Sequence, residues 1–180
     1  MLAHEVTDTT VREMHREKIR DFLSLHSRFL AHGDVLDYGC GDSPYRSLVL
    51  GNYVGWNRAD LPGTPYRENV GPDHPLDGNM KWDAILCTQV LQYVPDPMKL
   101  LYEFHNALKP NGVLLITIAT NWPEVETEDL HRFTSRGANQ ALATAGFRAL
   151  YISHTGYIAF GHVGADFNLP LGWGFVCELA

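Results

Sequence analysis

The sequence contains no long run of apolar residues. No stretch approaches the ~20 consecutive apolar residues that a membrane-spanning helix requires. Residues 1–18 (MLAHEVTDTTVREMHREK) carry charges along their length and lack the apolar core of a signal peptide. We therefore expect a cytoplasmic protein without a membrane partner.

Basic charge is also scarce, and so are metal-binding patterns. The chain has 14 Lys and Arg against 21 Asp and Glu, whereas nucleic-acid binding relies on clustered Lys and Arg. Its three cysteines, Cys40, Cys87 and Cys177, lack the spacing of a metal site. No two of its nine histidines lie three or four residues apart, as a helical ligand pair would. We expect neither a nucleic-acid partner nor a metal site.

What the chain does contain is one series of alternating strands and helices. Its 180 residues suffice for one domain with a sizeable core, and no repeat or linker divides them. Apolar patterns predict strands at 35–38, 53–56, 83–88, 113–118, 147–153 and 175–179, with an edge strand near 67–70. Helices are predicted within 1–33, ending at Gly33, over 44–50, from Pro97 to about Pro110, and from Thr134 to Gly146. This order predicts a doubly wound α/β fold with a mostly parallel sheet.

In such sheets ligands bind at the carboxyl ends of the strands, which points first to the turn after residues 35–38. Gly39 and Gly41 in this turn can adopt backbone angles that other residues avoid, and they let a ligand approach the main chain. A dinucleotide motif would have a third glycine where this chain has Pro44, which has no N–H for a pyrophosphate. Asp37 and Asp42 instead suit a positively charged ligand such as S-adenosylmethionine. A tight turn without a ligand is the alternative.

Five segments resemble the motifs of one enzyme family, and they occur in the family's order. They are VLDYGCGDSPY (35–45), YVGW followed by ADLPG (53–63), WDAILCTQVLQYVPDP (82–97), LKPNGVLLITI (108–118) and HRFTSRGANQALATAGF (131–147). The chain thus resembles the class I S-adenosylmethionine-dependent methyltransferases, in particular their small single-domain members. The resemblance implies one methyltransferase domain over residues 1–180, with a Rossmann-like sheet of seven strands, the last of them antiparallel.

The resemblance also implies which residues bind the cofactor, S-adenosylmethionine. By position they are Asp37, Gly39, Cys40 and Gly41 around its methionine part, Thr88 and Gln89 after the fourth strand, and Asp73 at the adenine. In the family an acid after the second strand holds the ribose hydroxyls through charge-assisted bonds. The usual spacing offers Asn57, while the Leu-Pro-Gly that follows favours Asp60. Ser43 stands where the family often has a further glycine.

An acceptor site is predicted from aromatic residues in segments expected at the same edge of the sheet. Methyl transfer from a sulfonium mainly requires alignment of the acceptor and exclusion of water. The substrate-binding candidates are Tyr45, Tyr93, Trp122, Phe133 and Tyr157. His131 is the preferred catalytic base because imidazole titrates near neutrality, and a structural or exposed histidine is the alternative.

Residues 154–174 (HTGYIAFGHVGADFNLPLGWG) carry a single formal charge, that of Asp166. Solvated loops are seldom so apolar, so this stretch is interpreted as a lid over the acceptor site, as a contact in a homodimer, or as a core-forming insertion. The function that we expect is methylation of an oxygen or nitrogen atom of a small molecule. A methyltransferase-like binding module without turnover and a protein-directed methyltransferase are the alternatives.

Overall fold

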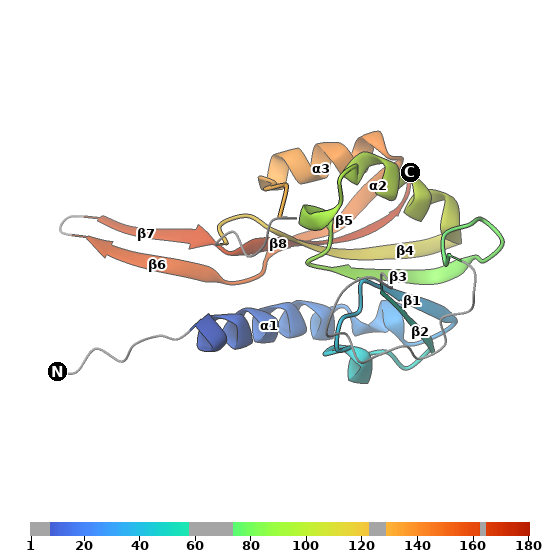
Figure 1. The fold of residues 1–180 in the computed structure, drawn as a ribbon, viewed down its shortest axis with the longest axis horizontal. Coiled ribbons are helices and arrows are strands. Elements are labelled where there is room, and N and C mark those ends of the chain that lie inside the picture. The colour runs from blue at the N-terminus through green and yellow to red at the C-terminus, as the bar shows by residue number, and fades with distance from the viewer. Residues whose placement is uncertain (1–7, 58–73, 123–128, 163–164) are drawn as a thin grey trace.

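Six of the predicted strands occur in the predicted order, and they form a doubly wound sheet with helices on both faces (Figure 1). The computed structural model describes residues 8–57, 74–122, 129–162 and 165–180. The helices are α1 (Asp8–Leu25), α2 (Pro97–Ala107) and α3 (Ser135–Thr144), with 3₁₀ turns at Ser27–Leu30, Arg46–Leu48 and Leu91–Tyr93. The strands are β1 (Asp34–Tyr38), β2 (Asn52–Trp56), β3 (Trp82–Thr88), β4 (Leu108–Ala119), β5 (Phe147–His154), β6 (Tyr157–His162), β7 (Ala165–Pro170) and β8 (Gly172–Leu179).

The main sheet has the strand order β2-β1-β3-β4-β8-β5. Strands β1 to β4 are parallel to one another, whereas β8 runs antiparallel to both β4 and β5. The prediction of an antiparallel last strand is therefore confirmed. The described part of the chain forms six strands of this sheet and not the expected seven, and the edge strand predicted near 67–70 lies outside the described residues.

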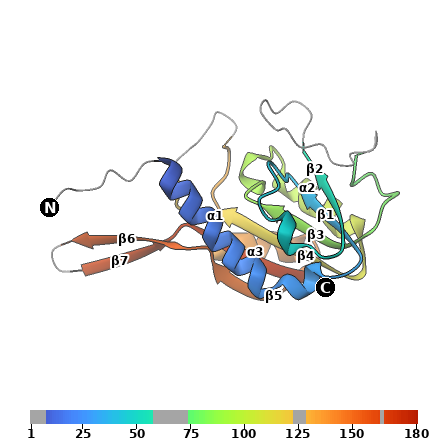
Figure 2. The same cartoon turned by 90° about the horizontal axis from the view of Figure 1, so that it is seen from below.

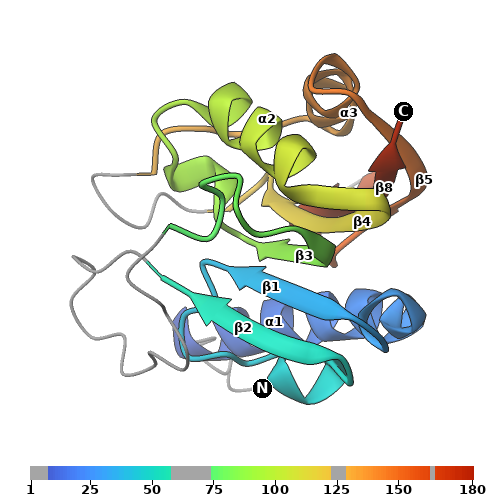
Figure 3. The ribbon, with the colours of Figure 1, turned by 90° about the vertical axis from the view of Figure 1, so that its right-hand side faces the viewer.

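Helix α1 covers one face of the sheet, and α2 and α3 cover the other (Figures 1 and 3). Successive residues of a strand point to opposite faces, so each central strand contributes to two cores. In β4, Leu114 and Ile116 pack in the core that contains α2 and α3, whereas Val113 and Leu115 pack in the core that contains α1. Burial on both faces explains the nearly uninterrupted apolar runs of these strands in the sequence.

The starts of α2 and α3 follow their predicted capping residues. The Asp96 side chain accepts a hydrogen bond from the Lys99 N–H at 2.9 Å, and Pro97 opens the first turn of α2. Thr134 Oγ1 accepts a hydrogen bond from the Gly137 N–H at 3.1 Å at the start of α3. Both caps satisfy main-chain donors that the helix itself leaves unpaired. Among the described helices, none is both long and apolar enough to cross a membrane.

The predicted end of the first helix at Gly33 is wrong. Helix α1 ends at Leu25, and the chain then tightens into a 3₁₀ turn that buries Leu30 completely. The Leu30 carbonyl accepts hydrogen bonds from the N–H groups of Leu50 and Gly51, at 3.0 and 3.1 Å. A later segment of the chain thus pairs with the 3₁₀ turn, while α1 itself has already ended at Leu25.

Several further boundaries differ from the prediction, of which the following two differ most. The helix expected over 44–50 is reduced to the 3₁₀ turn at Arg46–Leu48. The strand expected at 113–118 begins earlier, at Leu108, directly after α2, because Leu108 pairs with Trp82 of β3. Neither difference changes the order of the strands in the main sheet.

Strands β6 and β7, which come from the low-charge stretch 154–174, pair with each other in a separate antiparallel hairpin. The hairpin projects beyond the main sheet, at the same end of the molecule as the N-terminus of α1 (Figures 1 and 2). The hairpin follows β5 and precedes β8. It therefore extends from the edge of the main sheet where the carboxyl ends of the parallel strands lie. The role of a lid over the acceptor site stays a prediction.

Candidate active site

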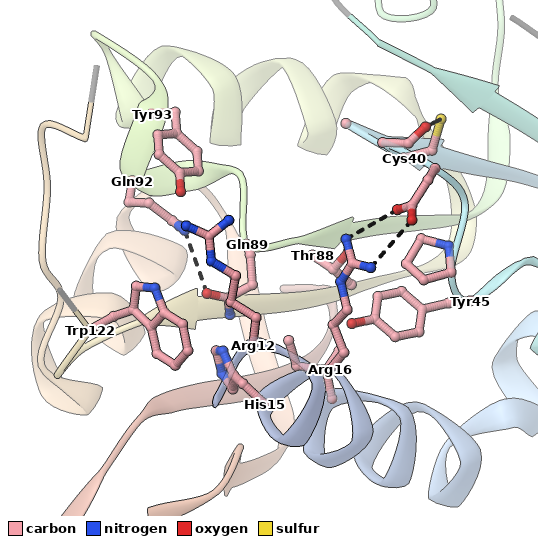
Figure 4. A pocket seen from close by; sticks show the side chains of 15 residues that line it. Arg12, His15, Arg16, Cys40, Tyr45, Thr88, Gln89, Gln92, Tyr93 and Trp122 are labelled. Carbon is pink, nitrogen blue, oxygen red and sulfur yellow. Dashed lines mark hydrogen bonds and ion pairs between the residues drawn. The ribbon is translucent and has the colours of Figure 1, made fainter. Parts of the chain in front are cut away.

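A pocket of about 230 Å³ lies where the carboxyl ends of β1 and β3 meet α1 (Figure 4). Its lining comes from the turn after β1 (Gly39, Cys40, Gly41, Asp42, Pro44, Tyr45), the end of β3 and its following turn (Thr88, Gln89, Gln92, Tyr93), α1 (Arg12, His15, Arg16, Ile19) and Trp122 after β4. This is the edge at which doubly wound sheets bind ligands. Among the described residues, no cluster of His, Cys, Asp and Glu is placed to hold a metal ion.

The pocket brings together eight of the residues predicted for the site. Five of them were predicted for the cofactor and three for the acceptor: Gly39, Cys40, Gly41, Thr88 and Gln89, and Tyr45, Tyr93 and Trp122. They meet because parallel strands end at one edge of the sheet, whatever their separation along the chain.

The two glycines of the turn after β1 serve different purposes. Both have a positive φ, 74° at Gly39 and 55° at Gly41, which L side chains rarely adopt. A Cβ at Gly39 would lie 2.4 Å from Cγ2 of Val90, so packing excludes a side chain there. A Cβ at Gly41 would have no atom within 4 Å. The main chain at Gly41 therefore borders open space that a ligand can occupy.

Asn57 holds this turn in place. Its Oδ1 accepts a hydrogen bond from the Gly41 N–H at 3.0 Å, and its Nδ2 donates to the Gly41 carbonyl at 3.1 Å. The side-chain amide thus pairs with both main-chain groups of Gly41. Of the two residues predicted for the ribose, Asn57 is engaged with the protein, while Asp60 lies outside the described residues, as does Asp73.

Asp37, the fourth residue of β1, is buried near the turn and does not line the pocket. The Tyr53 hydroxyl donates a hydrogen bond to Oδ2 at 2.9 Å, whereas Oδ1 has no hydrogen-bond partner in the described part of the chain. Burial raises the pKa of Asp37 to about 7, because a low-dielectric environment disfavours the charged carboxylate. An unpartnered carboxyl oxygen close to an open glycine turn fits a ligand that carries a positive charge.

Gln89, at the end of β3, has a strained backbone. Its φ of 56° costs a non-glycine residue about 1–3 kcal/mol. Thr117 of β4 stabilises this conformation: the Gln89 N–H donates to the Thr117 carbonyl at 2.9 Å, and Gln89 Nε2 donates to Thr117 Oγ1 at 3.2 Å. Strain of this kind clusters at functional sites, where the surrounding structure fixes the direction of a side chain.

Helix α1 forms a wall of the pocket that the sequence analysis did not include. Arg12, His15 and Arg16 are spaced as residues of one helix face, and Ile19 continues that face into the core. Arg16 lies 3.3 Å from Asp42, and because both side chains are about half exposed the ion pair is weak. Basic residues in line with the apolar face of a helix are the sequence signal that identifies such a wall.

His15 is the histidine of this pocket. It is 6% exposed, and its ring stacks on that of Trp122 with 4.7 Å between centroids and 27° between planes. Its Nε2 lies 3.4 Å from Oγ1 of Thr155, which follows β5. Burial lowers the pKa of His15 to about 4, so the imidazole is neutral at physiological pH.

Three of the residues predicted for acceptor chemistry lie outside the pocket lining. Phe133 packs against the core that contains α2 and α3, and Tyr157 is half exposed with its ring 4.0 Å from that of His154. The His131 N–H donates to the Gln92 carbonyl at 3.1 Å, and its Nε2 is buried without a partner among the described residues. The bond to Gln92 ties the segment of His131 to the turn after β3 and keeps it beside the pocket.

Comparisons with known proteins agree with this fold. A family model described as a methyltransferase domain matches residues 11–152. A S-adenosylmethionine-dependent methyltransferase from Archaeoglobus fulgidus has a similar fold, with a TM-score of 0.64 at 14% identity over 90% of this chain and 93% of that one. So does 1,6-didemethyltoxoflavin-N1-methyltransferase from Burkholderia thailandensis with bound 1,6-didemethyltoxoflavin and S-adenosylhomocysteine, at TM-score 0.64 and 17% identity over 98% and 83% of the two chains.

Among curated proteins, a stretch of 37 residues is 43% identical to the ubiquinone biosynthesis O-methyltransferase of Histophilus somni. The stretch covers 21% of this chain and 16% of that relative, so it spans a small part of either protein.

Proposed function

Because the chain belongs to the class I S-adenosylmethionine-dependent methyltransferases, we propose that it methylates an oxygen or nitrogen atom of a small molecule. The observation that carries the proposal is the composition of one pocket, which joins the open glycine turn to a wall of aromatic residues and a buried histidine. A pocket of about 230 Å³ suits a compact acceptor better than a folded protein. The relatives named above that act on small molecules support the same substrate class.

The cofactor end of the pocket is the turn after β1. S-adenosylmethionine supplies an electrophilic methyl group on a sulfonium, and it also carries an ammonium group. We assign its methionine part to the main chain of Gly39, Cys40 and Gly41, because the backbone is open at Gly41. The unpartnered oxygen of Asp37 offers a negative charge for the ammonium group. Thr88 and Gln89 complete this end from β3.

The acceptor end is formed by residues from three other segments. Tyr93 and Trp122 provide flat apolar surfaces. His15 projects from α1 and adds a neutral imidazole that stacks on Trp122. Methyl transfer is an in-line displacement, so the main task of these residues is to align the acceptor and exclude water.

The proposed function is tested by binding and by turnover. Calorimetry is expected to show saturable binding of S-adenosylhomocysteine. A screen of small-molecule hydroxyl and amine compounds with S-adenosylmethionine, followed by mass spectrometry, is expected to show products heavier by one CH₂ group. Methylation of protein substrates together with no product from any small molecule would contradict the proposed substrate class.

Asn57 and Asp60 are expected to affect different properties of the protein. The Asn57→Ala variant loses both hydrogen bonds to Gly41, so its free energy of unfolding is expected to fall by about 1–3 kcal/mol in urea titrations.

We propose that Asp60 binds the ribose hydroxyls, and Asp60→Ala is expected to weaken S-adenosylhomocysteine binding by about 1.5–3 kcal/mol with unchanged stability. Equal cofactor affinity in Asp60→Ala and the unmodified protein would remove Asp60 from the site.

A further inference from the structure

The pocket has two chemically different ends, which α1 connects (Figure 4). Cys40 and Tyr45 lie at one end, with the glycine turn, and Tyr93, Gln92 and Trp122 lie at the other. The proposed function, on which this inference rests, assigns the glycine turn to the cofactor and leaves the second end for the acceptor. Aromatic side chains at that end favour an acceptor with a flat ring.

His15 reaches the acceptor end from α1. Its ring is held on one side by the stack on Trp122 and at Nε2 by Oγ1 of Thr155, 3.4 Å away. This is the one hydrogen bond of the imidazole among the described residues, so Nδ1 has no hydrogen-bond partner there. The imidazole is therefore fixed in direction and has one nitrogen to offer.

The same face of α1 carries positive charge. Arg12 and Arg16 flank His15 in the pocket lining, and the one acid of that lining, Asp42, already pairs with Arg16. Both guanidinium groups therefore border the pocket from the same helix face as His15.

We propose that His15 takes the proton of the acceptor, and that the reacting atom of the acceptor is a hydroxyl oxygen on a flat ring. In this arrangement the Nε2–H group of His15 donates to Thr155 Oγ1, and the lone pair of Nδ1 faces the acceptor. Thr155 and Trp122 set the direction of Nδ1 between them.

The balance of protons explains why a hydroxyl group fits this site. As the acceptor oxygen bonds to the methyl carbon, the bond between sulfur and that carbon breaks and its electron pair stays on sulfur. The oxygen then carries a positive charge, so its proton is strongly acidic and passes to Nδ1, and from there to solvent. Burial lowers the pKa of His15 to about 4, and even so weak a base accepts a proton from such an oxygen.

An alkyl amine presents a different problem. Its ammonium form has a pKa of about 10, so it must lose a proton before its nitrogen can attack. His15 is too weak a base for that step, because burial disfavours its protonated form. A base of this strength, fixed beside the acceptor end, therefore selects a hydroxyl acceptor over an alkyl amine.

The tautomer of His15 tests the proposal without an acceptor. In the protein loaded with S-adenosylhomocysteine at neutral pH, nitrogen-15 NMR of the imidazole is expected to show hydrogen on Nε2 and none on Nδ1. The His15→Gln variant identifies the signal, because it lacks it. The opposite tautomer, or a doubly protonated ring, would overturn the proposal, since no lone pair would then face the acceptor.

Turnover supplies the second measurement. Acceptors are compared in pairs that share a ring, a phenol and its aminomethyl analogue, beginning with phenol and benzylamine. The phenol is expected to be methylated, and the aminomethyl analogue is expected to remain unmethylated. His15→Gln is expected to lower kcat on the phenol by about 100-fold. The acceptor KM and the S-adenosylhomocysteine Kd are expected to stay within about threefold of the unmodified protein.

His105→Gln is the matched control, because His105 lies in α2 with its ring 5.6 Å from that of Phe147, away from the pocket lining. It is expected to retain the kcat of the unmodified protein.

The proposal would be overturned if kcat is unchanged in His15→Gln. It would also be overturned if the aminomethyl analogue is methylated at the same rate as the phenol. A loss of kcat in His131→Gln alone would assign the base to His131. Absence of S-adenosylhomocysteine binding would instead contradict the proposed function, so the two failures are distinguishable.

Discussion

Replacing Gly41 with valine is expected to weaken S-adenosylhomocysteine binding by at least about 100-fold, which corresponds to about 2.7 kcal/mol. The new side chain meets no protein atom, since a Cβ at Gly41 has no atom within 4 Å, so its methyl groups enter the space assigned to the cofactor. The φ of 55° adds a backbone cost of about 1–2 kcal/mol for a residue with a Cβ. Calorimetric titration of the purified variant measures the change in affinity.

Gly78 provides the matched control for this substitution. Its φ is 90°, and a Cβ there also has no atom within 4 Å, but the residue does not line the pocket. Gly78→Val is therefore expected to lose a similar amount of stability and to keep the affinity for S-adenosylhomocysteine. If the Gly41→Val and Gly78→Val variants bind this ligand equally well, the cofactor does not lie against the turn after β1.

Asp37 is expected to make both stability and cofactor affinity depend on pH. Its pKa is raised by burial from 3.8 to about 7 in the folded protein, so the folded state binds a proton that the unfolded state has already lost. The contribution of Asp37 to the free energy of unfolding is therefore highest below pH 4, falls as the pH rises toward 7, and stays constant above it. The full change is about 4 kcal/mol for a shift of this size.

The neighbours of Asp37 do not mask this titration. The pKa values of Tyr53, Cys40 and Cys87 are all raised, mainly by burial, and that of Tyr45 is raised to about 12. These groups stay protonated and uncharged while Asp37 titrates. An ammonium group bound near Asp37 favours the carboxylate, so affinity for S-adenosylhomocysteine is expected to rise between pH 6 and 8.

The Asp37→Asn variant separates the two effects. Asparagine has nearly the same shape and no charge to bury, so the free energy of unfolding above pH 7 is expected to exceed that of the unmodified protein by a few kcal/mol, about 4 at most. Cofactor affinity is expected to fall by about 10–100-fold and to lose its pH dependence. Urea titrations and calorimetry at several pH values measure both, and parallel pH profiles for the two proteins would refute the role of Asp37.

The amino-acid sequence by itself determined the order of the strands of the main sheet, and it pointed to the turn after β1 as the proposed cofactor site. The signals involved are short in range: Asp96 and Thr134 each cap the first turn of their own helix. Gly39 and Gly41 adopt their positive φ within the turn that contains them. Because these interactions join neighbours along the chain, the pattern of residues is enough to predict them.

Only the tertiary structure decided which side chains complete the site. His15 and Thr155 lie 3.4 Å apart although 140 positions separate them in the sequence. His131 was predicted from the chemistry of its side chain alone, and a main-chain hydrogen bond to Gln92 keeps it beside the pocket. The physical reason is that α1 buries its apolar face against the sheet. That packing joins segments that are far apart in the sequence, and it sets the direction in which His15 and its neighbouring arginines point.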